Sequence, residues 1–101
     1  MIIYNVTVKL HPSIEKEWVH WMREEHMPKL FDTGLFESYQ LSKLLDQDET
    51  DGVTYVAQYN CKNREEYEQY ISEHAPQMRE DGIRKFGDKF IAFRTLMERQ
   101  F

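Results

Sequence analysis

The chain has 101 residues, of which 41% are hydrophobic, 31% are charged and 14% are aromatic. Four glycines and three prolines exclude collagen-like and low-complexity material, and the apolar share is too high for a disordered chain. With 13 basic and 18 acidic residues the formal charge is −5, which argues against nucleic acid or an anionic membrane surface as a partner. We expect one folded domain over residues 1–101.

The sequence also indicates the cellular compartment in which the protein is expected. No apolar run approaches the roughly 20 residues that span a bilayer, and the first residues lack the pattern of a secretory leader. Cys61 is the only cysteine, which excludes an intrachain disulfide and agrees with a reducing compartment. We therefore expect a cytoplasmic protein with no membrane partner.

The first half of the chain predicts a strand, a helix and a second strand. Apolar residues alternate from Ile2 to Leu10, as in a half-buried strand. A helix is expected from its cap at Ser13 into the high twenties, with Pro28 kinking or tightening it and Gly34 ending the segment. Residues 35–45 return to a strand pattern.

The second half predicts another strand, helix and strand. Val53–Cys61 is β-rich, and the polar loop before it predicts a hairpin. Asn63 is the predicted cap of a second helix, which Pro76 and Gly82 are expected to interrupt. Its apolar stripe is expected at Tyr67, Ile71, His74, Ala75 and Met78. Lys89–Met97 predicts the last strand.

This order of elements predicts an α+β fold of the ferredoxin-like βαββαβ type. Right-handed crossovers place both helices on one face of a four-stranded antiparallel sheet. The other face is expected to carry Ile3, Phe36, Leu44, Val56 and either Ile91 with Phe93 or Phe90 with Leu96. Monomers rarely leave such a patch exposed. We therefore expect a homodimer in which the open sheet faces cover each other.

Several segments together carry a resemblance to a known family. They are the strand Met1–Val8, the Trp pair in Trp18–Met22, the His-x-Pro element in Glu24–Pro28 and the Gly-Leu-Phe element in Thr33–Phe36. In this order they resemble a family of short, uncharacterised bacterial proteins of the dimeric α+β barrel superfamily.

The resemblance covers nearly the whole chain and implies a ferredoxin-like protomer and a homodimer with face-to-face sheets. The superfamily includes cofactor-free monooxygenases acting on aromatic polyketides, haem-degrading enzymes, peroxidases and proteins without known activity. The family that this chain resembles has no assigned chemistry, so the resemblance implies fold and assembly rather than a reaction.

The first predicted helix holds two candidate catalytic residues. At α-helical spacing Glu25 falls on the same stripe as Trp18 and Trp21, and His26 lies at its margin. A carboxylate and an imidazole beside indoles are groups whose pKa values proteins shift for proton transfer. The alternative is structural: Glu25 reaches the helix rim and His26 caps the last carbonyls.

The remaining candidates lie on other elements. His74 falls within the apolar stripe of the second helix, where it is either a core residue or a ligand or acid–base group. We expect Trp18, Trp21, Tyr39 and His74 to line a pocket between the helices and the sheet. No metal and no cofactor are expected, because the sequence has no phosphate-binding loop, and the acidic and histidine residues at helical spacing fall on a solvated face.

The sequence leaves three functions open. The first is a small-molecule binding protein that accepts an apolar or aromatic molecule. The second is a cofactor-independent enzyme of the monooxygenase or isomerase kind. The third is a purely structural or interaction dimer. An open pocket of a few hundred Å³ on which Glu25, His26 or His74 converges would favour the first two.

Overall fold

The computed structural model describes residues 1–101 and contains one four-stranded sheet. The strands are β1 (Ile2–Leu10), β2 (Ser38–Lys43), β3 (Val53–Cys61) and β4 (Phe90–Glu98). Their order is β2-β3-β1-β4, and every neighbouring pair is antiparallel. Burial alternates strictly along β3, as expected for a strand with one covered face.

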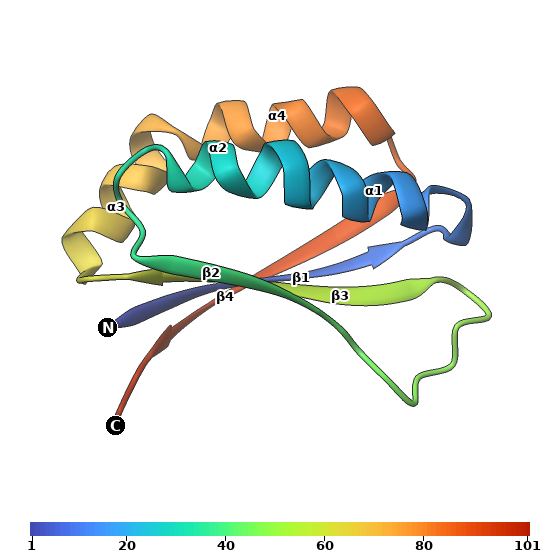
Figure 1. Cartoon of the computed structure of the whole chain (residues 1–101), viewed down its shortest axis with the longest axis horizontal. Coiled ribbons are helices and arrows are strands. Elements are labelled where there is room, and N and C mark those ends of the chain that lie inside the picture. Colours follow the sequence, from blue (N-terminus) through green and yellow to red (C-terminus); the bar gives the residue numbers. More distant parts are fainter.

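All helices lie on the same face of this sheet (Figure 1). The first crossover contains α1 (Glu15–Trp21) and α2 (Met27–Phe31), joined by a π-helical turn at Met22–His26. The second contains α3 (Arg64–Glu73) and α4 (Ala75–Phe86). Each crossover passes over one strand before it rejoins the sheet, so the predicted ferredoxin-like α+β fold is confirmed.

Capping side chains and prolines set the ends of the helices, and two of these ends differ from the prediction. The Asn63 side chain accepts a hydrogen bond from the backbone N–H of Glu66 at 2.9 Å, which confirms the predicted cap. The cap of the first helical segment is His11 rather than Ser13, because the His11 ring accepts from the Ser13 N–H. Gly82 does not interrupt α4; the break falls at His74, and Pro76 lies in the first turn of α4.

The core lies between the sheet and the helices. It contains 21 buried residues, with β1 and β3 contributing the sheet side and the two tryptophans the helix side. A chain of tyrosines runs through it: the ring of Tyr4 lies 5.9 Å from that of Tyr59 and 5.8 Å from that of Tyr70. No helix is long and apolar enough to cross a membrane.

Phe36 is on the covered side of the molecule, not on the open sheet face where it was expected. The strand β2 begins only at Ser38, so the period of two does not apply to the residues before it. Phe36 is buried, and its ring lies 5.0 Å from the ring of Tyr70 in α3.

The open face divides into an apolar part and a polar part. The pairing of Thr7 with Phe93 and of Lys9 with Ile91 turns Ile91 and Phe93 outward, where they are 55% and 61% exposed. Phe90 and Leu96 therefore face the helices. On the other side of β1, the Gln58 amide donates to Asn5 Oδ1 at 3.1 Å and accepts from Gln40. The large exposed apolar side chains of this face are thus on β4.

Candidate functional site

The π-helical turn decides which side chains of the first helical segment point inward. The Met27 N–H bonds to the carbonyl of Met22, five residues earlier. A proline cannot donate to the carbonyl four residues before it, and its ring would clash with that carbonyl in a regular helix. We attribute the wider turn to Pro28, which widens the helix where a kink or a tighter turn was predicted.

The same turn overturns the predicted position of Glu25. In a regular helix Glu25 would follow Trp18, Trp21 and Met22 on the buried stripe. The extra residue in the wide turn shifts the phase by one, so Glu25 is exposed and His26 occupies the inward position. The buried stripe then continues with Met27 and Leu30.

A cavity of about 320 Å³ lies between the helices and the β1–β4 side of the sheet. Fourteen of its 19 lining residues are hydrophobic, which is typical of a site for a small organic molecule. Trp18, Trp21 and His26 line it from the first helical segment, and Gly82 lines it from α4. A Cβ atom at Gly82 would lie 3.6 Å from Phe90 and 3.7 Å from Trp21, so the missing side chain leaves part of the space open.

His26 is the one titratable group of the predicted set that the fold brings to this cavity. Its ring stacks on Trp21 at a centroid distance of 4.4 Å, and its buried Nδ1 has no protein hydrogen-bond partner. Burial lowers the pKa of His26 to about 4, although the Asp81 carboxylate acts in the opposite direction. At neutral pH the imidazole is therefore uncharged and can accept a hydrogen bond.

A surface ion pair flanks His26. Lys29 Nζ lies 2.9 Å from Asp81 Oδ2, which joins α2 to α4 beside the imidazole. The hydrogen bonds from Lys29 and from Gln77 lower the pKa of the Asp81 carboxyl. The two charges of this ion pair act on His26 in opposite directions, because Asp81 raises the pKa of the imidazole and Lys29 lowers it.

Three polar groups at the cavity were missed by sequence reasoning. Arg94 Nε donates to Tyr4 Oη at 3.2 Å, and Arg79 Nη2 donates to the same oxygen at 3.4 Å. Both arginines are exposed, whereas Tyr4 is buried, so the pair marks the mouth of the cavity. In the sequence, Arg94 alternates with Ala92 and Leu96, which all point to the same side of β4. The sequence alone does not show whether that side faces the helices.

Tyr39 and His74 do not line this cavity, although they were expected to. Tyr39 is on β2, at the opposite edge of the sheet from β4, and packs on Phe31 with ring centroids 5.4 Å apart. His74 occupies the junction of α3 and α4.

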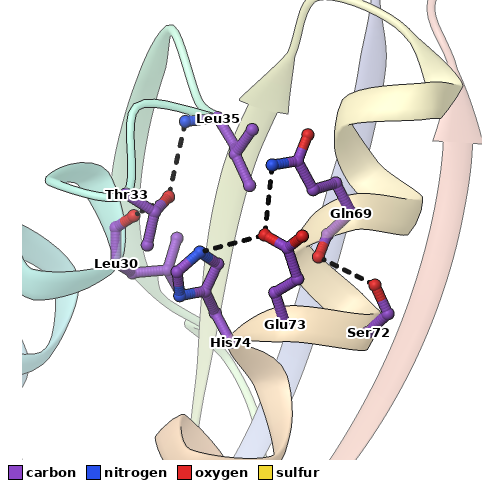
Figure 2. Close-up of polar contacts among 7 residues, drawn as sticks. All are labelled: Leu30, Thr33, Leu35, Gln69, Ser72, Glu73 and His74. Atoms are coloured by element: carbon purple, nitrogen blue, oxygen red, sulfur yellow. Dashed lines mark hydrogen bonds and ion pairs between the residues drawn. The ribbon is translucent and has the colours of Figure 1, made fainter.

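The surroundings of His74 are those of a surface residue. Figure 2 shows its ring beside Leu30 and Thr33, with one nitrogen directed at Glu73. Its Nε2 lies 3.9 Å from Glu73 Oε2, and its ring is stacked on Tyr70 at 6.2 Å. Tyr70 itself lines the cavity, so His74 is one ring removed from it.

The fold and the cavity define the class of protein as an α+β protein of the ferredoxin-like type with an apolar hollow between helices and sheet. The chain belongs to the family described as "Domain of unknown function (DUF4286)", which matches residues 1–100. A comparison with curated protein sequences finds no match.

Solved structures share the fold at low sequence identity. An ethyl tert-butyl ether (EthD) family protein from Bacillus halodurans is 11% identical, with a TM-score of 0.71 over 99% of this chain and 100% of its own. A variant of SnoaB, a cofactor-independent oxygenase from Streptomyces nogalater, is 11% identical, with a TM-score of 0.68 over 99% and 93%. A dimeric ferredoxin-like protein from an uncultured marine organism is 12% identical, with a TM-score of 0.63 over 99% and 97%.

Proposed function

We propose that this protein is a homodimer that binds a small apolar or aromatic molecule in the cavity between its helices and its sheet. The observation that carries the proposal is the cavity itself, which remains open although 21 residues pack into the core around it. A cavity of about 320 Å³ also falls within the range of small-molecule sites, roughly 300–1,000 Å³.

The chemistry of the lining supports an aromatic or other apolar occupant. Trp18 and Trp21 offer indole rings, and the neutral His26 offers a single hydrogen-bonding nitrogen. These rings stabilise a flat apolar molecule by burying its apolar surface and by ring–ring contacts, and the polar nitrogen of His26 fixes its orientation.

The homodimer is supported by the open sheet face and by the dimeric ferredoxin-like relative. Ile91, Phe93 and Met97 are exposed on β4, and Ile3 lies beside them on β1. Covering these side chains removes apolar surface from water, which stabilises association by about 25 cal/mol per Å² before the costs of binding are subtracted.

Ligand binding is tested by filling the cavity. We expect some members of a library of small aromatic and apolar compounds to raise the Tm and to change the tryptophan fluorescence, because Trp18 and Trp21 line the site. Gly82→Leu places a side chain against Phe90 and Trp21 and should abolish both responses. Glu80→Leu adds the same side chain at an exposed position of α4 and should leave them unchanged.

If no compound shifts the Tm of the unmodified protein, the binding function is wrong and the purely structural or interaction dimer is the remaining function. If compounds bind equally well to Gly82→Leu, they bind elsewhere and the cavity is not the site.

A second candidate function is catalysis without a cofactor, of the monooxygenase or isomerase kind, and the position of His26 favours it. The His26 ring lines the cavity with an unpartnered buried Nδ1, so it can hydrogen-bond to a bound molecule and polarise it, whereas a pKa of about 4 makes it a weak base. A compound that binds should then be converted in air by the unmodified protein and not by His26→Phe. Equal conversion by both proteins would exclude His26 from the reaction, and no conversion by either protein would leave binding as the function.

A further inference from the structure

We propose that the cavity takes an amphipathic anion: a molecule with an apolar body that enters the cavity and a carboxylate or similar acidic group that is held at the mouth by Arg79, Arg94 and Tyr4. This inference rests on the proposed binding function and specifies the chemical class of its ligand.

The charge of the cavity is opposite to that of the whole protein. The chain carries 18 acidic and 13 basic residues, for a formal charge of −5. The cavity lining nevertheless contains Arg79 and Arg94 and no aspartate or glutamate. Because His26 is neutral, the lining has a formal charge of +2 from the two guanidinium groups. Two like charges at one opening repel each other unless an anion joins them.

The two guanidinium groups have no carboxylate partner in the protein. Other basic residues of α4 are paired: Arg84 with Glu80, and Lys85 with Glu17. Arg79 and Arg94 form no ion pair and instead share the neutral phenol oxygen of Tyr4. A phenol is a weak acceptor for two cations, and each guanidinium has five N–H groups with which it can hold a carboxylate more strongly.

The three groups come from separate elements and meet at one point. Arg79 lies on α4, Arg94 on β4 and Tyr4 on β1. The Tyr4 oxygen accepts from both arginines, so its own O–H proton is free to be donated. An acidic group at the mouth would thus meet two planar cations and one hydroxyl donor, while the ring or chain attached to it reaches the tryptophans.

An inward-facing charge on an edge strand has another known role, which is to prevent strand pairing with a second chain. That role accounts for Arg94 on β4 but not for Arg79, which comes from a helix. It also predicts no preference between charged and neutral ligands, so a binding experiment separates the two roles.

The experiment compares matched pairs of probes. The two members of a pair share the same apolar group, and one is the carboxylic acid while the other is its primary amide. The acids are benzoate, 2-naphthoate, octanoate and decanoate. Dissociation constants are measured by tryptophan fluorescence and calorimetry for the unmodified protein, for Arg79→Gln/Arg94→Gln and for the control Arg84→Gln, an exposed arginine of the same helix.

We expect at least one acid to bind more tightly than its amide, and the double variant to weaken that acid by roughly 10- to 100-fold while leaving the amide unchanged. Added salt should weaken the acid more than the amide, and Arg84→Gln should bind like the unmodified protein. If amides bind as tightly as acids, or if Arg84→Gln weakens the acid as much as the double variant does, the anionic class is wrong and the binding function stands. If neither acids nor amides bind, the binding function itself fails.

Discussion

His26 shows how one buried side chain couples stability to pH. The unfolded chain holds the histidine near its ordinary pKa of about 6.5, whereas burial lowers the pKa in the folded protein to about 4. Between these values the unfolded state binds a proton that the folded state does not. The free energy of unfolding therefore falls as the pH falls through this window, and His26 has no such effect above it.

We expect His26→Phe to remove this part of the pH dependence while keeping an aromatic ring on Trp21. The shift of the pKa to about 4 corresponds to about 3 kcal/mol. The free energy of unfolding, measured by urea denaturation, should therefore fall more steeply for the unmodified protein than for the variant between about pH 6.5 and 4. His20→Gln, at an exposed histidine of α1, is the control. Parallel pH curves for the unmodified protein and His26→Phe would contradict the prediction.

The residues at the cavity differ in how far the sequence identifies them. Trp18 and Trp21 follow from helical spacing alone, and the structure places both at the cavity. Glu25 and His26 exchange roles because one wide turn changes the phase, and hydrophobic spacing carries no signal for such a turn. Arg79 and Arg94 could not be paired with Tyr4 from the sequence, because their meeting depends on the packing of α4 against the edge strand.

At the scale of elements, the start of α3 depends on a single amide. The Asn63 side chain satisfies the N–H of Glu66, one of the groups that a helix leaves unbonded at its first turn. Asn63→Ala should lower the free energy of unfolding by about 1 kcal/mol, which corresponds to a fall in Tm of roughly 4–8 °C for a domain of this size.

The control for this substitution keeps an acceptor at the cap. Asn63→Asp provides a carboxylate that accepts from the same N–H and should retain most of the stability. Calorimetry of the three proteins measures the effect. Equal Tm values for Asn63→Ala and the unmodified protein would mean that α3 is held by packing alone.

The boundaries of the elements show the limits of local signals. The three long strands lie within one residue of their predicted bounds, and burial alternates over all nine residues of β3. The strand β2 is shorter than predicted, because Leu35 and Phe36 belong to the loop before it. Both are buried, so their apolar side chains resemble the start of a strand in the sequence. Gly82 lies within α4 despite the low helix propensity of glycine, and it lines the cavity beside Phe90 and Trp21, a tertiary setting that helix propensity alone does not reveal.

At the scale of the whole molecule, the open sheet face is the expected dimer interface. Phe93 is 61% exposed and lies next to Ile91 in the apolar part of that face. We expect Phe93→Asp to convert the dimer into a monomer, because two like charges would meet across the twofold axis in a desolvated interface. Light scattering at micromolar concentration should then report half the mass of the unmodified protein.

Leu45→Asp is the matched control, because Leu45 is 74% exposed in the connection between β2 and β3 and is not on that face. Its mass should equal that of the unmodified protein. A monomeric mass for the unmodified protein would contradict the dimer proposal, and an unchanged mass for Phe93→Asp would move the interface elsewhere.

The register of strand β4 determines both the proposed dimer face and the arginine side of the cavity. Phe93 faces outward, while its neighbours Ala92 and Arg94 line the cavity. The connection from α4 contains only residues 87–89, and the backbone N–H of His11 bonds to the Lys89 carbonyl at 2.8 Å, which fixes where the strand starts. A slip of one residue would turn Phe93 into the cavity and Arg94 toward the partner. The length of this short connection is therefore under two constraints at once, and an insertion there would remove ligand selectivity and assembly together.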